Sequence, residues 1–262
     1  MSAIIVQEHI AHYEVLGRGR PVLFLHGWVG SWRYWVPAMQ SASQRYRAYA
    51  IDLWGFGDSD KHAAVYHLDA QVRLLAAFLD EMGIHKVAIV GHGLGAVVGM
   101  LFSLHYPLAV DRLALIAMPS EMAAIHSRLR TDPLEKLITW LLPPTTSTEA
   151  ARKEAPKADP AAIATSLSDL ENMNLLAEML NVEVPCLLVH GRNDPLVRLP
   201  TATALTQWPD NMHQIVFEQS GHFPMLDEPS KFNRLMYDFL LLDSGASPRQ
   251  LQLKEEWKRR VR

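Results

Sequence analysis

The chain has 262 residues, of which 49% are hydrophobic and 20% are charged, and its formal net charge is -3. This composition excludes a disordered chain, and the small negative charge gives no electrostatic basis for binding nucleic acid. The length favours one large α/β domain with a sizeable core.

The sequence also indicates the cellular compartment of the protein. It contains a single cysteine, Cys186, which cannot form an internal disulfide and suits a reducing compartment. The first residues lack the basic start and long apolar core of a signal peptide, and no run reaches the roughly 20 apolar residues that cross a bilayer. We therefore expect a cytoplasmic protein without a transmembrane segment, present as a monomer or homodimer.

The first half of the chain alternates between apolar runs and amphipathic stretches. Two short alternating runs, 4–7 and 11–16, predict an antiparallel hairpin at a sheet edge. Continuous apolar runs predict buried strands, and a 3.6-residue period predicts helices between them. These strands are expected at 21–25, 46–51, 86–90 and 111–117, with helices at 68–82 and 94–105. The alternation indicates a mostly parallel sheet with right-handed crossovers and helices on both faces.

The alternation stops after Pro119. Helical patterns at 134–142 and 160–180 are separated by proline-rich and polar stretches. We interpret residues 119–182 as a small helical cap that is inserted between two strands and lies over the strand ends. Residues 1–118 and 183–262 then form the α/β core.

The strand and helix pattern resumes near residue 184. Strands are expected at 184–190 and 214–217, and helices at 199–208 and 229–242. The last of these helices carries an apolar stripe that should face the sheet. The net basic tail, 244–262, is either a short docked helix or a frayed end.

The stretch Gly91-His92-Gly93-Leu94-Gly95 joins a predicted strand to a predicted helix. A strand, a glycine-rich turn and a helix are the setting of the nucleophile elbow, G-x-S-x-G, whose central residue occupies the tip of a strained turn. The central residue here is Gly93, which has no side chain to attack a substrate. The motif therefore indicates a hydrolase in which the nucleophile is missing.

Three further motifs stand at the ends of predicted strands, where ligands gather in parallel sheets. They are His26-Gly27-Trp28, Asp194, and Gly221-His222. Together with the elbow, and in this order, they resemble the α/β-hydrolase superfamily over the chain up to about Leu242. The sequence is most similar to capped esterases and carbon–carbon bond hydrolases, whose last helix has a pattern like Phe232-Asn233-Arg234-Leu235.

The resemblance implies a role for each motif. His222 corresponds to the general base and Asp194 to the carboxylate that orients it. The backbone N–H groups of Trp28 and Leu94 correspond to the oxyanion hole. Gly93 stands where the family places serine or, in some relatives, cysteine or aspartate.

Other residues near these motifs have simpler explanations. We expect His26 to brace the oxyanion turn and His92 to point away from the nucleophile position. Asp52 should help to form a turn, and Cys186 should be buried in a strand. No residues have metal-ligand spacing, and the glycine-rich turns lack the lysine or acid of nucleotide motifs, so neither a metal nor a cofactor is expected.

The substrate class follows from the apolar residues on the predicted loops. Trp54, Phe223 and Met225 are the expected substrate-binding residues. Their side chains favour a small hydrophobic substrate with an apolar acyl, alkyl or aryl group. A hydrophobic carboxylic ester is therefore the expected substrate of the parent enzyme, in which position 93 would carry the nucleophile.

Three explanations of Gly93 are open at this point. It is an engineered or recent replacement of serine in an ester hydrolase, which leaves this form inactive or strongly impaired. Alternatively, the chain is a natural enzyme in which His222 and Asp194 activate water or transfer another proton, including carbon–carbon bond hydrolysis. In the third explanation it is a non-catalytic protein that binds a small molecule. The retention of both the His222 and Asp194 motifs favours the first.

Overall fold

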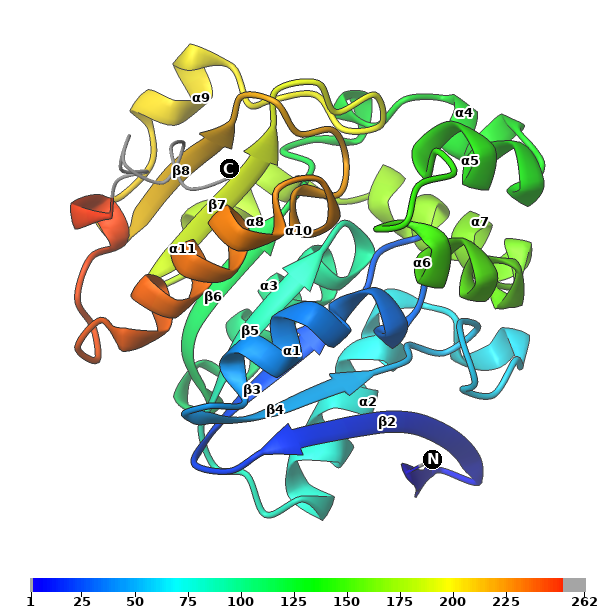
Figure 1. Ribbon diagram of the computed structural model, residues 1–262, viewed down its shortest axis with the longest axis horizontal. Coiled ribbons are helices and arrows are strands. Elements are labelled where there is room, and N and C mark those ends of the chain that lie inside the picture. The colour runs from blue at the N-terminus through cyan, green and yellow to red at the C-terminus, as the bar shows by residue number, and fades with distance from the viewer. Residues whose placement is uncertain (1, 252–262) are drawn as a thin grey trace.

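An eight-stranded sheet runs through the computed structural model, which describes residues 2–251 (Figure 1). The strand order is β1-β2-β4-β3-β5-β6-β7-β8. Strand β2 pairs antiparallel with β1 and β4, and the remaining neighbours are parallel. The strands are β1 Ser2–Val6, β2 His9–Gly17, β3 Arg20–Leu25, β4 Tyr46–Ile51, β5 Val87–His92, β6 Val110–Ile116, β7 Cys186–Gly191 and β8 Met212–Phe217.

Helices cover both faces of this sheet. Helices α1 and α11 lie on the face turned to the viewer in Figure 1, and α2 and α3 lie behind it. The helices are α1 Val36–Ala42, α2 Leu68–Glu81, α3 Leu94–His105, α4 Arg128–Thr131, α5 Leu134–Leu141, α6 Glu149–Glu154, α7 Pro160–Glu171, α8 Leu175–Leu180, α9 Ala202–Thr206, α10 Pro224–Asp227 and α11 Pro229–Leu241. None of the helices in residues 2–251 combines the length and hydrophobicity that a membrane crossing requires.

The predicted fold class and its main elements are confirmed. The N-terminal hairpin is antiparallel, and the apolar runs at the centre of the sheet are buried parallel strands. Between β6 and β7 the chain forms helices α4 to α8; Figure 1 shows α4 to α7 together beside one end of the sheet and α8 apart from them, where it contacts α3. Of the basic tail, residues 248–250 form a single 3-10 turn, and 252–262 lie outside the described residues.

Two local predictions were wrong. The single helix expected at 160–180 is divided into α7 and α8, because the Asn174 side chain accepts a hydrogen bond from the N–H of Ala177 and starts a new helix there. Helix α1 was not expected, because its seven residues are too few to show a clear period.

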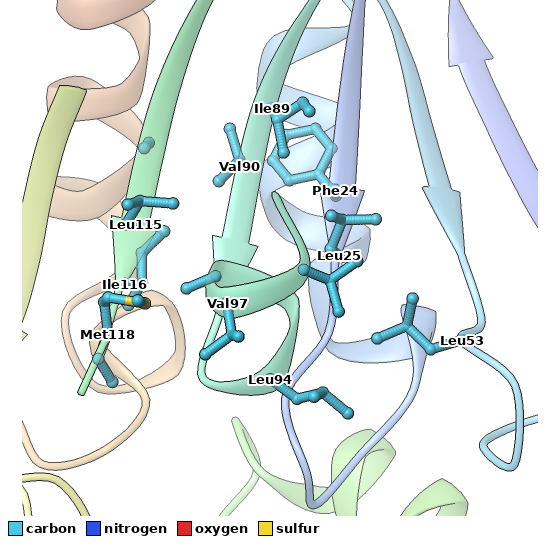
Figure 2. Packing of buried hydrophobic residues seen from close by; sticks show 14 of the residues in the cluster. Phe24, Leu25, Leu53, Ile89, Val90, Leu94, Val97, Leu115, Ile116 and Met118 are labelled. Atoms are coloured by element: carbon cyan, nitrogen blue, oxygen red, sulfur yellow. The ribbon is translucent and has the colours of Figure 1, made fainter. Parts of the chain in front are cut away.

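Helix α3 packs tightly against the middle of the sheet. Leu25 from β3, Val90 from β5, Ile116 from β6 and Val97 from α3 belong to one buried cluster (Figure 2). The close approach requires a glycine, because a Cβ on Gly95 would lie 2.5 Å from the carbonyl oxygen of Leu25. The beginning of α3 is thereby fixed above the carboxyl ends of β3 and β5.

A buried carboxylate organises the loops beside β4. Asp52 accepts hydrogen bonds from the N–H groups of Trp32, at 2.8 Å, and Asp58, at 3.0 Å, and its Oδ2 lies 2.9 Å from Nδ1 of His12. Burial alone would lower the pKa of His12, but the hydrogen bond and charge of Asp52 raise it above its ordinary value. Gly57 turns over this carboxylate with a φ of +52.

We predict that Gly57→Ala destabilises the protein more than Gly83→Ala does. Both glycines have a positive φ, +52 and +62, so each variant incurs a backbone strain of about 1–2 kcal/mol. A Cβ on Gly83 meets nothing within 4 Å, whereas one on Gly57 would lie 2.2 Å from the carboxylate of Asp52. Overpacking should raise the loss of unfolding free energy for Gly57→Ala to about 3 kcal/mol or more, measured by urea unfolding. Equal losses of unfolding free energy for the two variants would show that the loop around Asp52 moves to accommodate the added Cβ.

Candidate active site

Gly93 forms the tip of a sharp turn between β5 and α3. Its φ is 50 and its ψ is -111, a conformation that strains any residue with a side chain. Its N–H donates to the carbonyl of Ile116, at 2.9 Å, and its carbonyl accepts from Ala96 and Val97 at the start of α3. The backbone therefore has the strand-to-helix turn that was predicted for the elbow.

The structure brings His222 and Asp194 together. His222 follows β8 and Asp194 follows β7, and Nδ1 of His222 lies 2.9 Å from Oδ2 of Asp194. The other carboxylate oxygen, Oδ1, accepts the N–H groups of Leu196, at 2.8 Å, and Val197, at 3.0 Å. Both side chains of the pair are buried.

The surroundings of this pair favour a charged Asp194. Burial by itself would raise the pKa of Asp194, but His222 and the N–H groups of Val197 and Leu196 outweigh it and hold the pKa below its ordinary value. An ionised carboxylate accepts the Nδ1–H of His222. Nε2 then carries the lone pair, and the hydrogen bond described for this ring within residues 2–251 is the one made by Nδ1.

The two predicted oxyanion donors are available. In the part of the chain that the structure describes, the backbone N–H groups of Trp28 and Leu94 donate to no acceptor, although both residues are fully buried. Buried N–H groups are nearly always paired, so these two unpaired donors are unusual. The expectation that His26 braces this turn agrees with its hydrogen bonds: Nδ1 donates to Gly27, at 2.8 Å, and Nε2 accepts from Leu53, at 3.0 Å.

His92 links the three loops of the site. Burial, reinforced by the charge of His222, lowers the pKa of His92 well below its ordinary value, so the ring is neutral. Its Nε2 lies 2.9 Å from the carbonyl of His222, which only accepts, so Nε2 carries the proton. Nδ1 must then accept from the Tyr34 hydroxyl, at 2.9 Å, whose oxygen accepts the N–H of Gly27 at 2.7 Å. We define these four residues as the His92 network.

The indole of Trp28 fills the space beside Gly93. A Cβ on Gly93 would lie 3.2 Å from Cε3 and 3.3 Å from Cζ3 of this ring. The indole Nε1–H donates to the Ser166 hydroxyl of α7, at 3.0 Å, and that hydroxyl donates to the carbonyl of Ile163. A side chain at position 93 therefore fits if the indole moves by a few tenths of an ångström, and α7 holds the indole where it is.

The three predicted substrate-binding residues are all buried but have different neighbours. The ring centroid of Phe223 lies 5.0 Å from that of His222 and 4.8 Å from that of His92. The ring contact described for Trp54 is with His9, at 5.8 Å, in the N-terminal hairpin. Met225 belongs to α10, which directly follows Phe223. Phe223 is thus the member of this set that contacts the candidate base.

The sequence did not identify Tyr34 and Ser166. Tyr34 follows the oxyanion turn within an aromatic cluster, which was a weak signal, but no spacing rule connects it to His92. Ser166 lies on the polar side of an ordinary helical pattern and gave no signal at all.

A group of possible metal ligands lies outside this site. His12, Asp52 and Asp58 offer ligand atoms that all lie within 4.8 Å of one another. Most of their ligand atoms already have partners, because Asp52 binds Nδ1 of His12 and two N–H groups, and Asp58 Oδ1 accepts from Lys157 at 2.8 Å. Nε2 of His12 has no hydrogen bond in the described residues but lies 3.4 Å from the Glu14 carboxylate. These contacts favour a structural role.

The comparisons identify the family. Residues 22–235 match the model of the alpha/beta hydrolase family. The chain belongs to this family. Over 87% of its length it is 25% identical to pimeloyl-(acyl-carrier protein) methyl ester esterase from Vibrio parahaemolyticus, of which it covers 97%.

Other relatives are hydrolases with different substrates. The chain is 27% identical, over 87% of its length and 86% of the relative, to 2-hydroxy-6-oxo-6-(2'-aminophenyl)hexa-2,4-dienoic acid hydrolase from Metapseudomonas resinovorans. The enol-lactonase from Burkholderia xenovorans LB400 has the same fold, with a TM-score of 0.80 and 17% identity over 92% of this chain and 100% of that one. The relatives thus include an esterase and a hydrolase of a dienoic acid.

We predict that Tyr34→Phe lowers the free energy of unfolding by about 2–4 kcal/mol, because it leaves the N–H of Gly27 and Nδ1 of His92 buried without partners. The measurement is urea unfolding followed by circular dichroism. Tyr49→Phe is the matched control, because no hydrogen bond of the Tyr49 hydroxyl is described within residues 2–251, and this variant should change stability by about 0.5 kcal/mol or less. The His92 network would have no stabilising role if both variants behaved alike.

Proposed function

We propose that this chain derives from an enzyme that hydrolyses a hydrophobic carboxylic ester with a nucleophile at position 93. Gly93 leaves the present form inactive or strongly impaired. The observation that carries the proposal is the pairing of His222 with Asp194, at 2.9 Å, beside an elbow whose backbone keeps the strained conformation at Gly93. The esterase among the relatives supports the same reaction class.

The proposed roles follow from the proton positions. Asp194 accepts the Nδ1–H of His222 and leaves Nε2 free to take a proton from a nucleophile at position 93. The N–H groups of Trp28 and Leu94 then stabilise the oxyanion of the tetrahedral intermediate. Gly93 supplies no hydroxyl, so the first proton transfer and the acylation cannot occur.

Cys186 does not replace the missing nucleophile. It lies in β7 and is buried, and burial raises the pKa of its thiol so that it stays protonated. We propose that it is a packing residue, consistent with a protein of the reducing cytoplasm.

We propose that residues 119–182 form a cap that contributes to substrate binding. Helix α7 of this segment holds Trp28 through Ser166, so it reaches the candidate site. The apolar ring of Phe223 beside His222 favours an apolar acyl or alcohol group. Trp54 and Met225 are proposed to extend the apolar surface, and the ligand is a single small molecule.

A second candidate is activation of a water molecule by His222. The pairing of Nδ1 of His222 with Asp194, which leaves Nε2 to accept a proton, and the two unpaired N–H groups favour it. The dienoic acid hydrolase among the relatives broadens the reactions to consider. The turn at Gly93 keeps the backbone conformation of a nucleophile elbow, which a water mechanism does not require. The impaired ester hydrolase is therefore preferred.

We predict that Gly93→Ser increases the hydrolysis of p-nitrophenyl acetate and butyrate by about 10³-fold or more over the unaltered protein, because it restores the nucleophile of an otherwise complete site. Gly93→Ala is the matched control: it adds the same Cβ and the same strain without a hydroxyl, and it should stay at the level of the glycine form. Adding His222→Ala to Gly93→Ser should remove the gain.

Two results would contradict this proposal. A glycine form that already turns over at an enzyme-like rate would favour water activation. A folded Gly93→Ser variant that stays inactive, while a metabolite raises the melting temperature of the unaltered protein, would favour the non-catalytic binding protein.

A further inference from the structure

We propose that a cavity at the amino ends of β3, β5 and β6 binds a small organic carboxylate. The cavity has a volume of about 250 Å³ and is lined by the charged residues Arg20, Lys86, Asp111 and Arg112. It is remote from Gly93 and His222, because these follow the carboxyl ends of their strands (Figure 1). The inference therefore does not depend on the proposed ester hydrolysis.

The guanidinium of Arg112 is the main evidence. Arg112 is only 1% exposed, and two of its three nitrogens have partners. Nε donates to Oδ2 of Asp111, at 2.6 Å, and Nη1 donates to the carbonyl of Phe239, at 2.7 Å. Nη2 is buried and has no partner in the described part of the chain. An unpaired donor on a buried cation is costly, so this nitrogen indicates that an acceptor belongs beside it.

The charges around the cavity favour an anion. Arg112, Arg20 and Lys86 contribute three positive charges, and Asp111 contributes the single carboxylate among the lining residues. Asp111 is already shared, because it also accepts from the Ser244 hydroxyl at 3.1 Å and lies 3.9 Å from the Lys86 ammonium. The C-terminal end of α11 adds a partial negative charge nearby, which reduces the excess of positive charge without reversing it.

The remaining groups of the cavity define the class of anion. The Tyr46 hydroxyl donates to the carbonyl of Leu240, at 2.8 Å, and accepts from Nη2 of Arg20, at 3.4 Å, so it is occupied. Pro21, Ala88 and the side chain of Leu240 give the cavity an apolar wall. A carboxylate oxygen accepts a charge-assisted hydrogen bond from a single guanidinium nitrogen such as Nη2 of Arg112, and a short alkyl or aryl group matches this wall.

The test is isothermal titration calorimetry of the whole protein with sodium benzoate at constant ionic strength. We expect saturable one-to-one binding of benzoate and no binding of benzamide, which has the same shape without the charge. Lys86→Ala should weaken the affinity for benzoate by about threefold. Arg112→Met should weaken it by about tenfold or more, because it removes the charged donor. Lys153→Ala, which removes an exposed cation elsewhere, is the matched control and should leave the affinity unchanged.

Three results would overturn the proposal. Benzoate and benzamide binding alike would show that charge has no part. Absence of benzoate binding to the unaltered, folded protein would show that water satisfies Arg112. Affinity that is lost in His222→Ala but kept in Lys86→Ala would place the carboxylate at the oxyanion donors instead. If Arg112→Met fails to fold, the Lys86→Ala and benzamide results decide the question by themselves.

Discussion

The close packing of α3 against the sheet is the constraint on which the rest of the candidate site depends. Gly95 lets the helix approach the carbonyl of Leu25, and its own N–H donates to the carbonyl of His26 at 2.9 Å. The chain must therefore turn sharply at Gly93 to leave β5 and enter α3. The same turn places the N–H of Leu94 at the beginning of the helix, where it has no internal acceptor. The geometry of the elbow is thus a property of the fold and does not require a side chain at position 93.

The loops around this turn are fixed by hydrogen bonds between residues far apart in the chain. The His92 network joins the turn at Gly27, the elbow and the loop of His222 through one chain of donors and acceptors. The indole of Trp28 adds a link to α7 through Ser166. Both ring nitrogens of His92 have partners, so the network fixes these loops without a side chain at position 93.

The sequence predicted those parts of the molecule whose signals are local. The apolar runs gave the parallel strands, and the motifs at the strand ends gave the pairing of His222 with Asp194 and the elbow at Gly93. It did not predict Tyr34 or Ser166, because each acts on a partner 58 or 138 residues away and no periodicity records such contacts. The unpaired nitrogen of Arg112 also depends on tertiary packing, since a strand pattern does not show which side chain is buried without an acceptor.

The central claim is that the absence of a hydroxyl at position 93 is what silences an otherwise complete hydrolase site. The most direct test is labelling with a fluorophosphonate, which reacts with activated serine hydroxyls, followed by intact-mass and peptide analysis. We expect Gly93→Ser to gain one covalent adduct on the peptide that contains position 93, and the unaltered protein and Gly93→Ala to gain none. A folded Gly93→Ser variant without the adduct, or an adduct elsewhere in the unaltered protein, would show that the missing hydroxyl is not what inactivates the site.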